Sequence, residues 1–321
     1  MLQRGIRQRG DEVPAVWEAW GPDAVPGLNG DRNEARGGSR HPGRPMGTIV
    51  SEFVTVIGID GAAQPKRTGV AHVESRPSGP VVREVTAWGE EIVKGWCLGA
   101  VPRLLVAVDI PLGWPVDSLS LAQHRAGQPV ACDADRAFLR HTDRVLREHP
   151  HLRDLDLRPM SIGADKIARA SHATLRRIQS IRASLGGATV LPILLDQRPV
   201  NRPGLVEVYP AATLASMGLR PRGSYKKGKS ARRVRESIVK ALRNCGMTFE
   251  GEAADKCVES DHALDAVLCA VAGDHFLQGK CVVFESGQRA LIEKEGWIWL
   301  LDPEARAGRL GRAKASPNTR H

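Results

Sequence analysis

The chain has 321 residues, 42% of them hydrophobic, and a formal net charge of +10. This length allows one sizeable hydrophobic core. No apolar run reaches the roughly 20 residues that a membrane-spanning helix needs, and no secretory signal is present. This argues against a membrane protein, and the cytoplasm is the expected location. The six cysteines form no C-x-x-C pair, which excludes a zinc-finger class, and the positive charge is compatible with a nucleic-acid partner without requiring one.

The two ends of the chain have compositions typical of disordered segments. Residues 1–47 are rich in Gly, Pro and Arg, and residues 303–321 are polar and basic. We therefore expect a disordered N-terminal extension, one folded domain over residues 48–302, and a disordered basic tail.

The first part of this domain is predicted to form strands. Residues 53–59 (FVTVIGI) are a β-branched run, and two extended segments follow at 69–75 and 81–88, with short turns that favour antiparallel pairing. Residues 104–110 (LLVAVDI) are apolar on both alternating faces, which is typical of a central strand covered by helices on both sides.

The rest of the domain alternates helices with strands, so the predicted fold class is α/β. Apolar stripes near helical spacing predict a helical insertion at about 130–190. After it we expect, in chain order, a strand at 204–209, helices that begin near Ser230 and cover 261–277, and a C-terminal β-hairpin made of 281–285 and 297–301.

Several carboxylates lie where this pattern predicts burial. They are Asp60 after the first strand, Asp109 at the end of the central strand, Glu207 inside a later strand, and Asp265 on the late helix with Asp261 one turn before it. A buried carboxylate is unfavourable unless it protonates, pairs with a cation or binds a metal, and Mg²⁺ or Mn²⁺ takes carboxylate, water and phosphate ligands. We expect all five to hold metal, with two cations assisting phosphodiester hydrolysis and with Asp60, Asp109, Glu207 and Asp265 as the catalytic acids.

Four of these five acids also have a simpler interpretation, and Asp265 lies too deep in its helix for the one that suits Asp261. Asp60 suits a turn at a strand end, Asp109 suits a strand-end acceptor, Glu207 suits pairing with an arginine such as Arg202, and Asp261 suits the positive end of its helix. Only their conjunction points to metal.

A basic run lies between the strand of Glu207 and the next helix. It contains Arg220, Arg222, Lys226, Lys227, Lys229, Arg232, Arg233 and Arg235, and we expect Lys226, Lys227, Arg232 and Arg233 to bind substrate. The alternative is a solvated loop and helix start.

Other polar residues also have two interpretations. His141 and His262 either assist proton transfer or are ordinary surface histidines. A polar set on the insertion, which includes Arg140 and Asp143, either caps the site or holds the helices together by ion pairs.

Seven segments support a family resemblance. They are GIDGA (58–62), VDIPLGWP (108–115), RHTDR (140–144), PMSIGADKI (159–167), VEVYPAATL (206–214), GSYK (223–226) and SDHALDA (260–266). In this order they resemble the bacterial and archaeal "domain of unknown function 429" family, whose members are regarded as predicted nucleases of the ribonuclease H-like superfamily. The resemblance covers residues 53–302 and departs at Met217, where many relatives carry tryptophan. It implies a mixed five-stranded sheet flanked by helices, with the acids named above forming an acidic centre at one edge.

The sequence therefore predicts a metal-dependent nuclease that acts on RNA or DNA, and two other classes stay open. An ATP-binding phosphotransferase of the actin-like type also begins with a G-I-D-type strand, but no second glycine-rich phosphate loop follows a later strand. A non-catalytic nucleic-acid-binding module is the other class, and binding that survives chelation without cleavage would identify it.

Overall fold

The computed structural model describes residues 53–148, 152, 157–187, 189–197 and 201–305. The predicted N-terminal extension, residues 1–47, lies outside these residues, and so do residues 306–321 of the predicted basic tail. The described residues form an α/β domain, as the sequence predicted.

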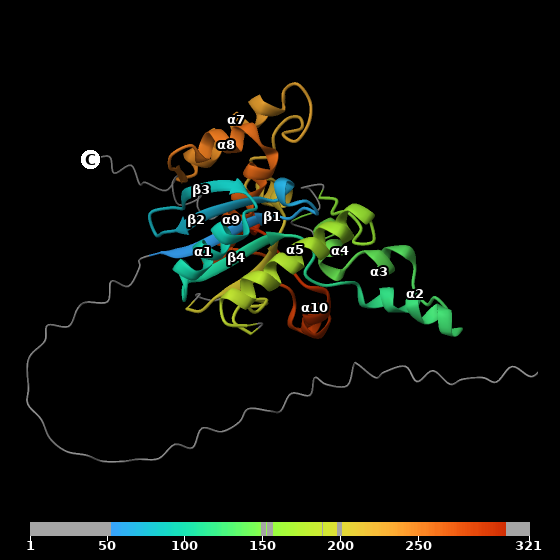
Figure 1. Ribbon diagram of the computed structural model, residues 1–321. Coiled ribbons are helices and arrows are strands. Elements are labelled where there is room, and N and C mark those ends of the chain that lie inside the picture. The colour runs from blue at the N-terminus through green and yellow to red at the C-terminus, as the bar shows by residue number, and fades with distance from the viewer. Residues whose placement is uncertain (1–52, 149–151, 153–156, 188, 198–200, 306–321) are drawn as a thin grey trace, which may run out of the picture. The chain divides into compact units, whose positions relative to one another are not determined.

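A seven-stranded mixed sheet lies at the centre of this domain, in the order β6-β3-β2-β1-β4-β5-β7. Figure 1 labels the strands β3, β2, β1 and β4 of this sheet. β2 is antiparallel to both of its neighbours, and all other neighbouring pairs are parallel. The strands are β1 (Val54–Asp60), β2 (Gly69–Ser75), β3 (Val81–Ala87), β4 (Leu104–Asp109), β5 (Gly204–Val208), β6 (Thr248–Phe249) and β7 (Ile298–Trp299). β1 is buried at every position, as expected for a strand with helices on both faces.

Two sequence predictions about the sheet need correction. The sheet has seven strands rather than five, because the two-residue strands β6 and β7 are added at its edges. The predicted C-terminal hairpin is not confirmed: a single antiparallel bridge joins Cys281 to Leu301, and β7 pairs in parallel with β5. A helix between these two segments separates them, so they do not form a continuous ladder.

Helices cover both faces of the sheet. One face packs against α9 together with α6, α7 and α8, and the other packs against α1 and α5. The helices are α1 (Glu90–Ala100), α2 (Leu119–Gln123), α3 (Ala134–Phe138), α4 (His141–Glu148), α5 (Asp165–Ser184), α6 (Pro210–Ser216), α7 (Ala231–Asn244), α8 (Ala253–Glu259), α9 (Asp261–Leu277) and α10 (Arg289–Glu295). None of the helices in the described residues is both long and apolar enough to cross a bilayer.

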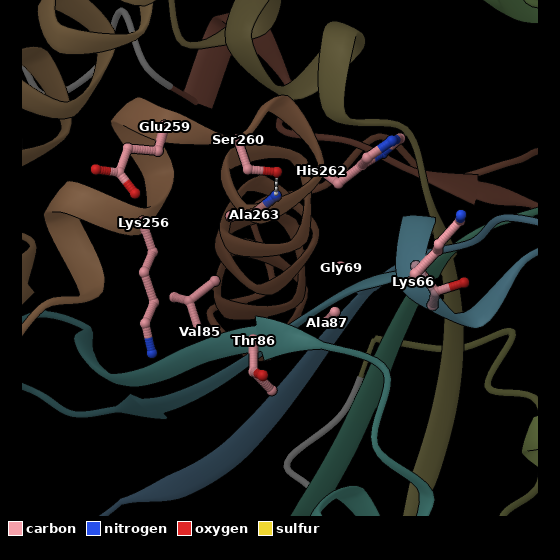
Figure 2. A pocket seen from close by; sticks show the side chains of 11 residues that line it. Lys66, Gly69, Val85, Thr86, Ala87, Lys256, Glu259, Ser260, His262 and Ala263 are labelled. Atoms are coloured by element: carbon pink, nitrogen blue, oxygen red, sulfur yellow. Dashed lines mark hydrogen bonds between the residues drawn. The ribbon is translucent and has the colours of Figure 1, made fainter.

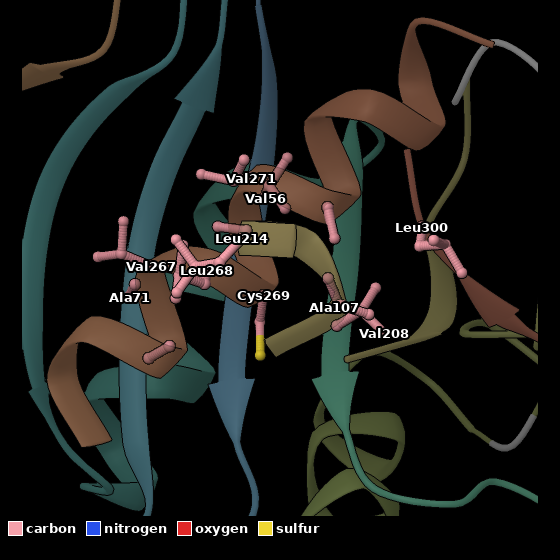
Figure 3. Packing of buried hydrophobic residues seen from close by; sticks show 14 of the residues in the cluster. Val56, Ala71, Ala107, Val208, Leu214, Val267, Leu268, Cys269, Val271 and Leu300 are labelled. Atoms are coloured by element: carbon pink, nitrogen blue, oxygen red, sulfur yellow. The ribbon is translucent and has the colours of Figure 1, made fainter. Parts of the chain in front are cut away.

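α9 is the central helix of its face and is buried along most of its length. Figure 3 shows Val267, Leu268 and Val271 of this helix packed over the strands. The helix and the sheet come unusually close at Gly58 and Gly69, where a Cβ atom would lie 2.0 Å from the carbonyl oxygens of Ala266 and His262, respectively. Because only glycine fits at such a contact, these positions fix the height of α9 above β1 and β2.

Candidate active site

Two of the predicted acids lie side by side at the ends of neighbouring strands. Asp60 is the last residue of β1, Asp109 is the last residue of β4, and the two are register partners in the parallel pair. Partners in register point to the same face of a sheet. Val56 and Ala107, which lie on the same faces of these strands, belong to the core beneath α9, so the two carboxylates also face that helix.

α9 adds a third carboxylate to this pair. Asp265 is 1% exposed on this helix, and burial together with the charge of Asp60 raises its pKa to about 6, against the opposing effect of Lys226. Burial and the charges of Asp60 and Asp265 raise the pKa of Asp109 well above its ordinary value. The three carboxylates therefore lie close enough to repel one another, and a cation among them would relieve that repulsion.

Asp265 is already bound by two residues of the GSYK segment. The Tyr225 hydroxyl donates to Oδ1 at 2.7 Å, and Nζ of Lys226 lies 2.6 Å from Oδ2. The sequence identified Lys226 as a substrate contact and gave no sign of Tyr225. Within the described part of the chain, no three Asp, Glu, His or Cys side chains are grouped so that they could hold a metal ion. A cation bound at Asp265 would lie close to the Lys226 ammonium group.

His262, in the first turn of α9, contacts the acid on β1. Its Nδ1 atom lies 2.7 Å from Oδ2 of Asp60, and this hydrogen bond raises the pKa of His262 against the opposing effect of burial. Asp261, predicted as a metal ligand, is the first residue of the helix and is only partly buried. In the described structure it makes no side-chain hydrogen bond to the other acids, and its charge also raises the pKa of His262.

A cavity of about 270 Å³ lies next to His262 at the N-terminal end of α9 (Figure 2). Lys66, Thr86 and Lys256 also line it, so its wall contains polar and cationic groups beside the acidic centre. A larger cavity of about 990 Å³ lies at the opposite end of α9, near Asp274, and none of the predicted acids lines it. None of the predicted acids lines the smaller cavity either, but His262, whose Nδ1 atom contacts Asp60, borders it, so it is the cavity next to the acidic centre.

Glu207, the fourth predicted catalytic acid, is not part of this centre. Its register partner on β4 is Val108, one residue before Asp109, so its side chain points to the opposite face of the sheet. On that face its two oxygens accept hydrogen bonds of 2.6 and 2.8 Å from Arg140. Glu207 is thus the partner of a buried arginine, and that arginine is Arg140 rather than the exposed Arg202.

Arg140 joins the insertion to the sheet through buried ion pairs. Its guanidinium also donates to Asp143 at 3.1 Å and to the carbonyl oxygen of Glu295 at 3.2 Å. Burial opposes the charge, but Glu207 and Asp143 raise the pKa of Arg140 above its ordinary value, while burial raises the pKa of Glu207 against the effect of Arg140. Arg140 and Asp143, two members of the polar set on the insertion, therefore have a structural role through ion pairs, one of the two roles that the sequence allowed.

The predicted substrate-binding cations differ in their surroundings. Lys227, Arg232 and Arg233 are exposed on the loop and at the start of α7, where a polyanion has access to them. Lys226 is turned into the acidic centre instead. Arg235, in the same basic run, is buried and donates only to backbone carbonyl oxygens among the described residues, so its role is structural.

Comparison with known proteins gives one match. Residues 58–289, more than half of the chain, match the model of the family described as "Protein of unknown function (DUF429)". No curated protein and no solved structure matches the chain. The matched region contains Asp60, Asp109, Lys226 and Asp265, whereas Glu295 and β7 lie beyond its end.

Proposed function

We propose that this chain, which belongs to the DUF429 family of proteins of unknown function, hydrolyses phosphodiester bonds in nucleic acid with the help of Mg²⁺ or Mn²⁺. The observation that carries this proposal is the convergence of Asp60, Asp109 and Asp265 from β1, β4 and α9 at one end of the sheet.

The donor set suits a hard divalent cation. Carboxylate oxygens are the ligands that Mg²⁺ and Mn²⁺ prefer, and in the described structure the Asp109 carboxylate has neither a hydrogen bond nor an ion pair to balance its charge. Asp60 and Asp109 would hold the ion from adjacent strands, and His262 orients Asp60 through its hydrogen bond. Such an ion lowers the pKa of a bound water and stabilises charge on the leaving oxygen.

Two further observations support a ribonuclease H-like nuclease. The central strands β3-β2-β1-β4-β5 form a mixed sheet with the number of strands that the resemblance implies, so that β6, β7 and the helical insertion would be additions to it. Exposed cations at Lys227, Arg232 and Arg233 lie within seven residues of Lys226 in the chain, and they offer a surface that binds a polyanion near the carboxylates.

The test compares cleavage of labelled DNA and RNA in Mg²⁺ or Mn²⁺ by the wild type, by Asp60→Asn and by Asp255→Asn. Asp255 is exposed on α8, so its substitution removes the same charge away from the centre. We expect metal-dependent cleavage by the wild type and by Asp255→Asn, and loss of both cleavage and Mn²⁺ binding in Asp60→Asn. Equal cleavage by the wild type and Asp60→Asn would refute the assignment of the site.

One observation favours a second candidate, a nucleic-acid-binding module without catalysis. Lys226 already neutralises Asp265, so the acidic cluster is partly stable without metal. This candidate predicts that nucleic acid binds equally well with and without a chelator and is never cleaved.

A further inference from the structure

We propose that Lys226 is a built-in cation of the acidic centre, so that the site works with one divalent ion at Asp60 and Asp109 and with the Lys226 ammonium group in place of a second ion. The inference rests on the proposed function, and it replaces the two-cation arrangement expected from the sequence. Lys226 then becomes a catalytic residue that contacts the phosphate being hydrolysed.

The first argument is that both oxygens of Asp265 already have a partner, one of them a cation. Tyr225 donates to Oδ1 at 2.7 Å and Lys226 contacts Oδ2 at 2.6 Å, while the side chain of Asp265 is 1% exposed. A metal ion at Asp265 would have to share an oxygen with one of these donors, and at Oδ2 it would lie beside the positive charge of Lys226. Asp60 and Asp109, in register on adjacent strands, remain as the pair that can hold an ion.

The second argument is that the fold anchors Lys226 in this position. The carbonyl oxygen of the preceding residue, Tyr225, accepts a hydrogen bond of 2.7 Å from the buried Arg235. Arg235 also donates to the carbonyl oxygens of Val258 and Glu259, at the end of the helix that leads into α9. The segment that carries Lys226 is thus tied to the end of α8, from which the chain enters α9 and Asp265, and the ammonium group is positioned before any substrate binds.

The third argument is that Lys226 keeps access to the substrate. Its side chain is 47% exposed although its ammonium group contacts a buried carboxylate. An ammonium group has three N–H donors, so a lysine that uses one on Asp265 can offer another to a phosphate oxygen.

The charges of the centre agree with this arrangement. Asp60, Asp109 and Asp265 carry three negative charges when ionised, and one divalent ion together with Lys226 balances them. A second divalent ion beside Lys226 would leave an excess of positive charge in a confined space, where like charges repel strongly.

In this arrangement Lys226 neither gains nor loses a proton during hydrolysis. The oxygen of a water molecule forms a bond to phosphorus while the bond from phosphorus to the leaving oxygen breaks. The water releases one proton to the solvent, and the leaving oxygen takes one from the solvent. Throughout, the Lys226 ammonium group donates a hydrogen bond to a non-bridging phosphate oxygen and offsets the charge that develops there.

The test counts Mn²⁺ bound per chain in the absence of nucleic acid, from the paramagnetic resonance signal of free Mn²⁺. The proteins are the wild type, Lys226→Gln, Lys226→Met, Lys226→Arg and, as a matched control, Lys240→Gln, which removes an exposed lysine on α7. We expect one Mn²⁺ in the wild type, in Lys226→Arg and in Lys240→Gln. The two neutral variants at position 226 should bind a second Mn²⁺ and should bind the first about tenfold more tightly, because a neighbouring positive charge has been removed.

The outcomes separate this inference from the function on which it rests. Two Mn²⁺ ions in the wild type, or an unchanged count and affinity in both neutral variants, would overturn the role of Lys226 and leave the nuclease proposal standing. A wild type that binds no Mn²⁺ would overturn both proposals. Circular dichroism of each variant shows that it is folded, and Lys226→Met provides the count if Lys226→Gln does not fold.

Discussion

Replacing Arg140 by methionine should destabilise the domain by about 3–5 kcal/mol, the range for breaking a buried ion pair. The Arg140 guanidinium contacts Glu207 at 2.6 Å and Asp143 at 3.1 Å, and all three side chains are at most 3% exposed. Methionine keeps much of the apolar volume of arginine but leaves both carboxylates buried without their cation. The loss therefore measures the charge interaction more than the packing.

The pKa of the carboxylate left without its arginine gives a loss of stability of the same magnitude. Burial raises the pKa of Glu207 above its ordinary value of 4.5, and without the opposing effect of Arg140 we expect this carboxyl group to be protonated in the folded variant. At about 1.4 kcal/mol for each pH unit above that pKa, this costs about 3 kcal/mol at pH 7 and below about 1 kcal/mol at pH 5. An acid whose pKa is raised in the folded state destabilises it increasingly as the pH rises above the unfolded value, so the loss in Arg140→Met should shrink on acidification.

Urea unfolding followed by circular dichroism measures both effects, at pH 7 and at pH 5. The matched control is Arg169→Met, because the ion pair of Arg169 with Asp165 has side chains that are 74% and 77% exposed. That substitution should change the free energy of unfolding by less than about 0.5 kcal/mol. A loss below about 1 kcal/mol in Arg140→Met at pH 7, or an equal loss at both pH values, would refute the ion network and return Glu207 to the list of candidate metal ligands.

Three other predictions concern α9 and the cysteines. Gly58→Ala should destabilise the domain by about 3 kcal/mol in urea unfolding, because its Cβ atom would lie 2.0 Å from the Ala266 carbonyl oxygen; a loss near zero would mean that helix and sheet are not in close contact. With a chelator present, His262→Gln should lower the urea midpoint most at pH values below the ordinary histidine pKa of 6.5. The hydrogen bond with Asp60 raises the pKa of His262, and its stabilising effect is lost as the pH rises through the raised value. A difference between the two proteins that does not depend on pH would contradict this prediction. In the native chain a maleimide should label the exposed Cys245 well before the four buried cysteines, whose pKa values are raised by burial, and mass spectrometry would detect the opposite order.

The central strands were predictable because local apolar runs and turns mark them. The structure places β1 to β5 within one residue of the predicted ends. β6 has two residues, too few for any periodicity to be visible in the sequence, whereas the two residues of β7 lie inside the strand predicted at 297–301. Their pairing depends on where distant segments pack, so the sequence did not indicate it.

The acidic centre was predictable only in part, for a similar reason. Asp60, Asp109 and Asp265 could be identified because a strand end and a helix face are local features. Glu207 could not be placed, because β4 and β5 are apolar on both faces and such strands do not reveal their register. One residue of register decides whether Glu207 faces Asp109 or Arg140.

The contacts of Glu295 reach beyond the part of the chain that the family shares. This buried residue accepts hydrogen bonds from the backbone N–H groups of Val116 and His141, and its carbonyl oxygen accepts one from Arg140, yet the matched region ends at residue 289. A fragment truncated there would retain every acid of the centre but would open the far side of the insertion to water. The segment needed for folding is therefore longer than the segment defined by family similarity. Loss of activity in such a truncated fragment would reflect an incompletely folded domain rather than a wrongly assigned catalytic residue.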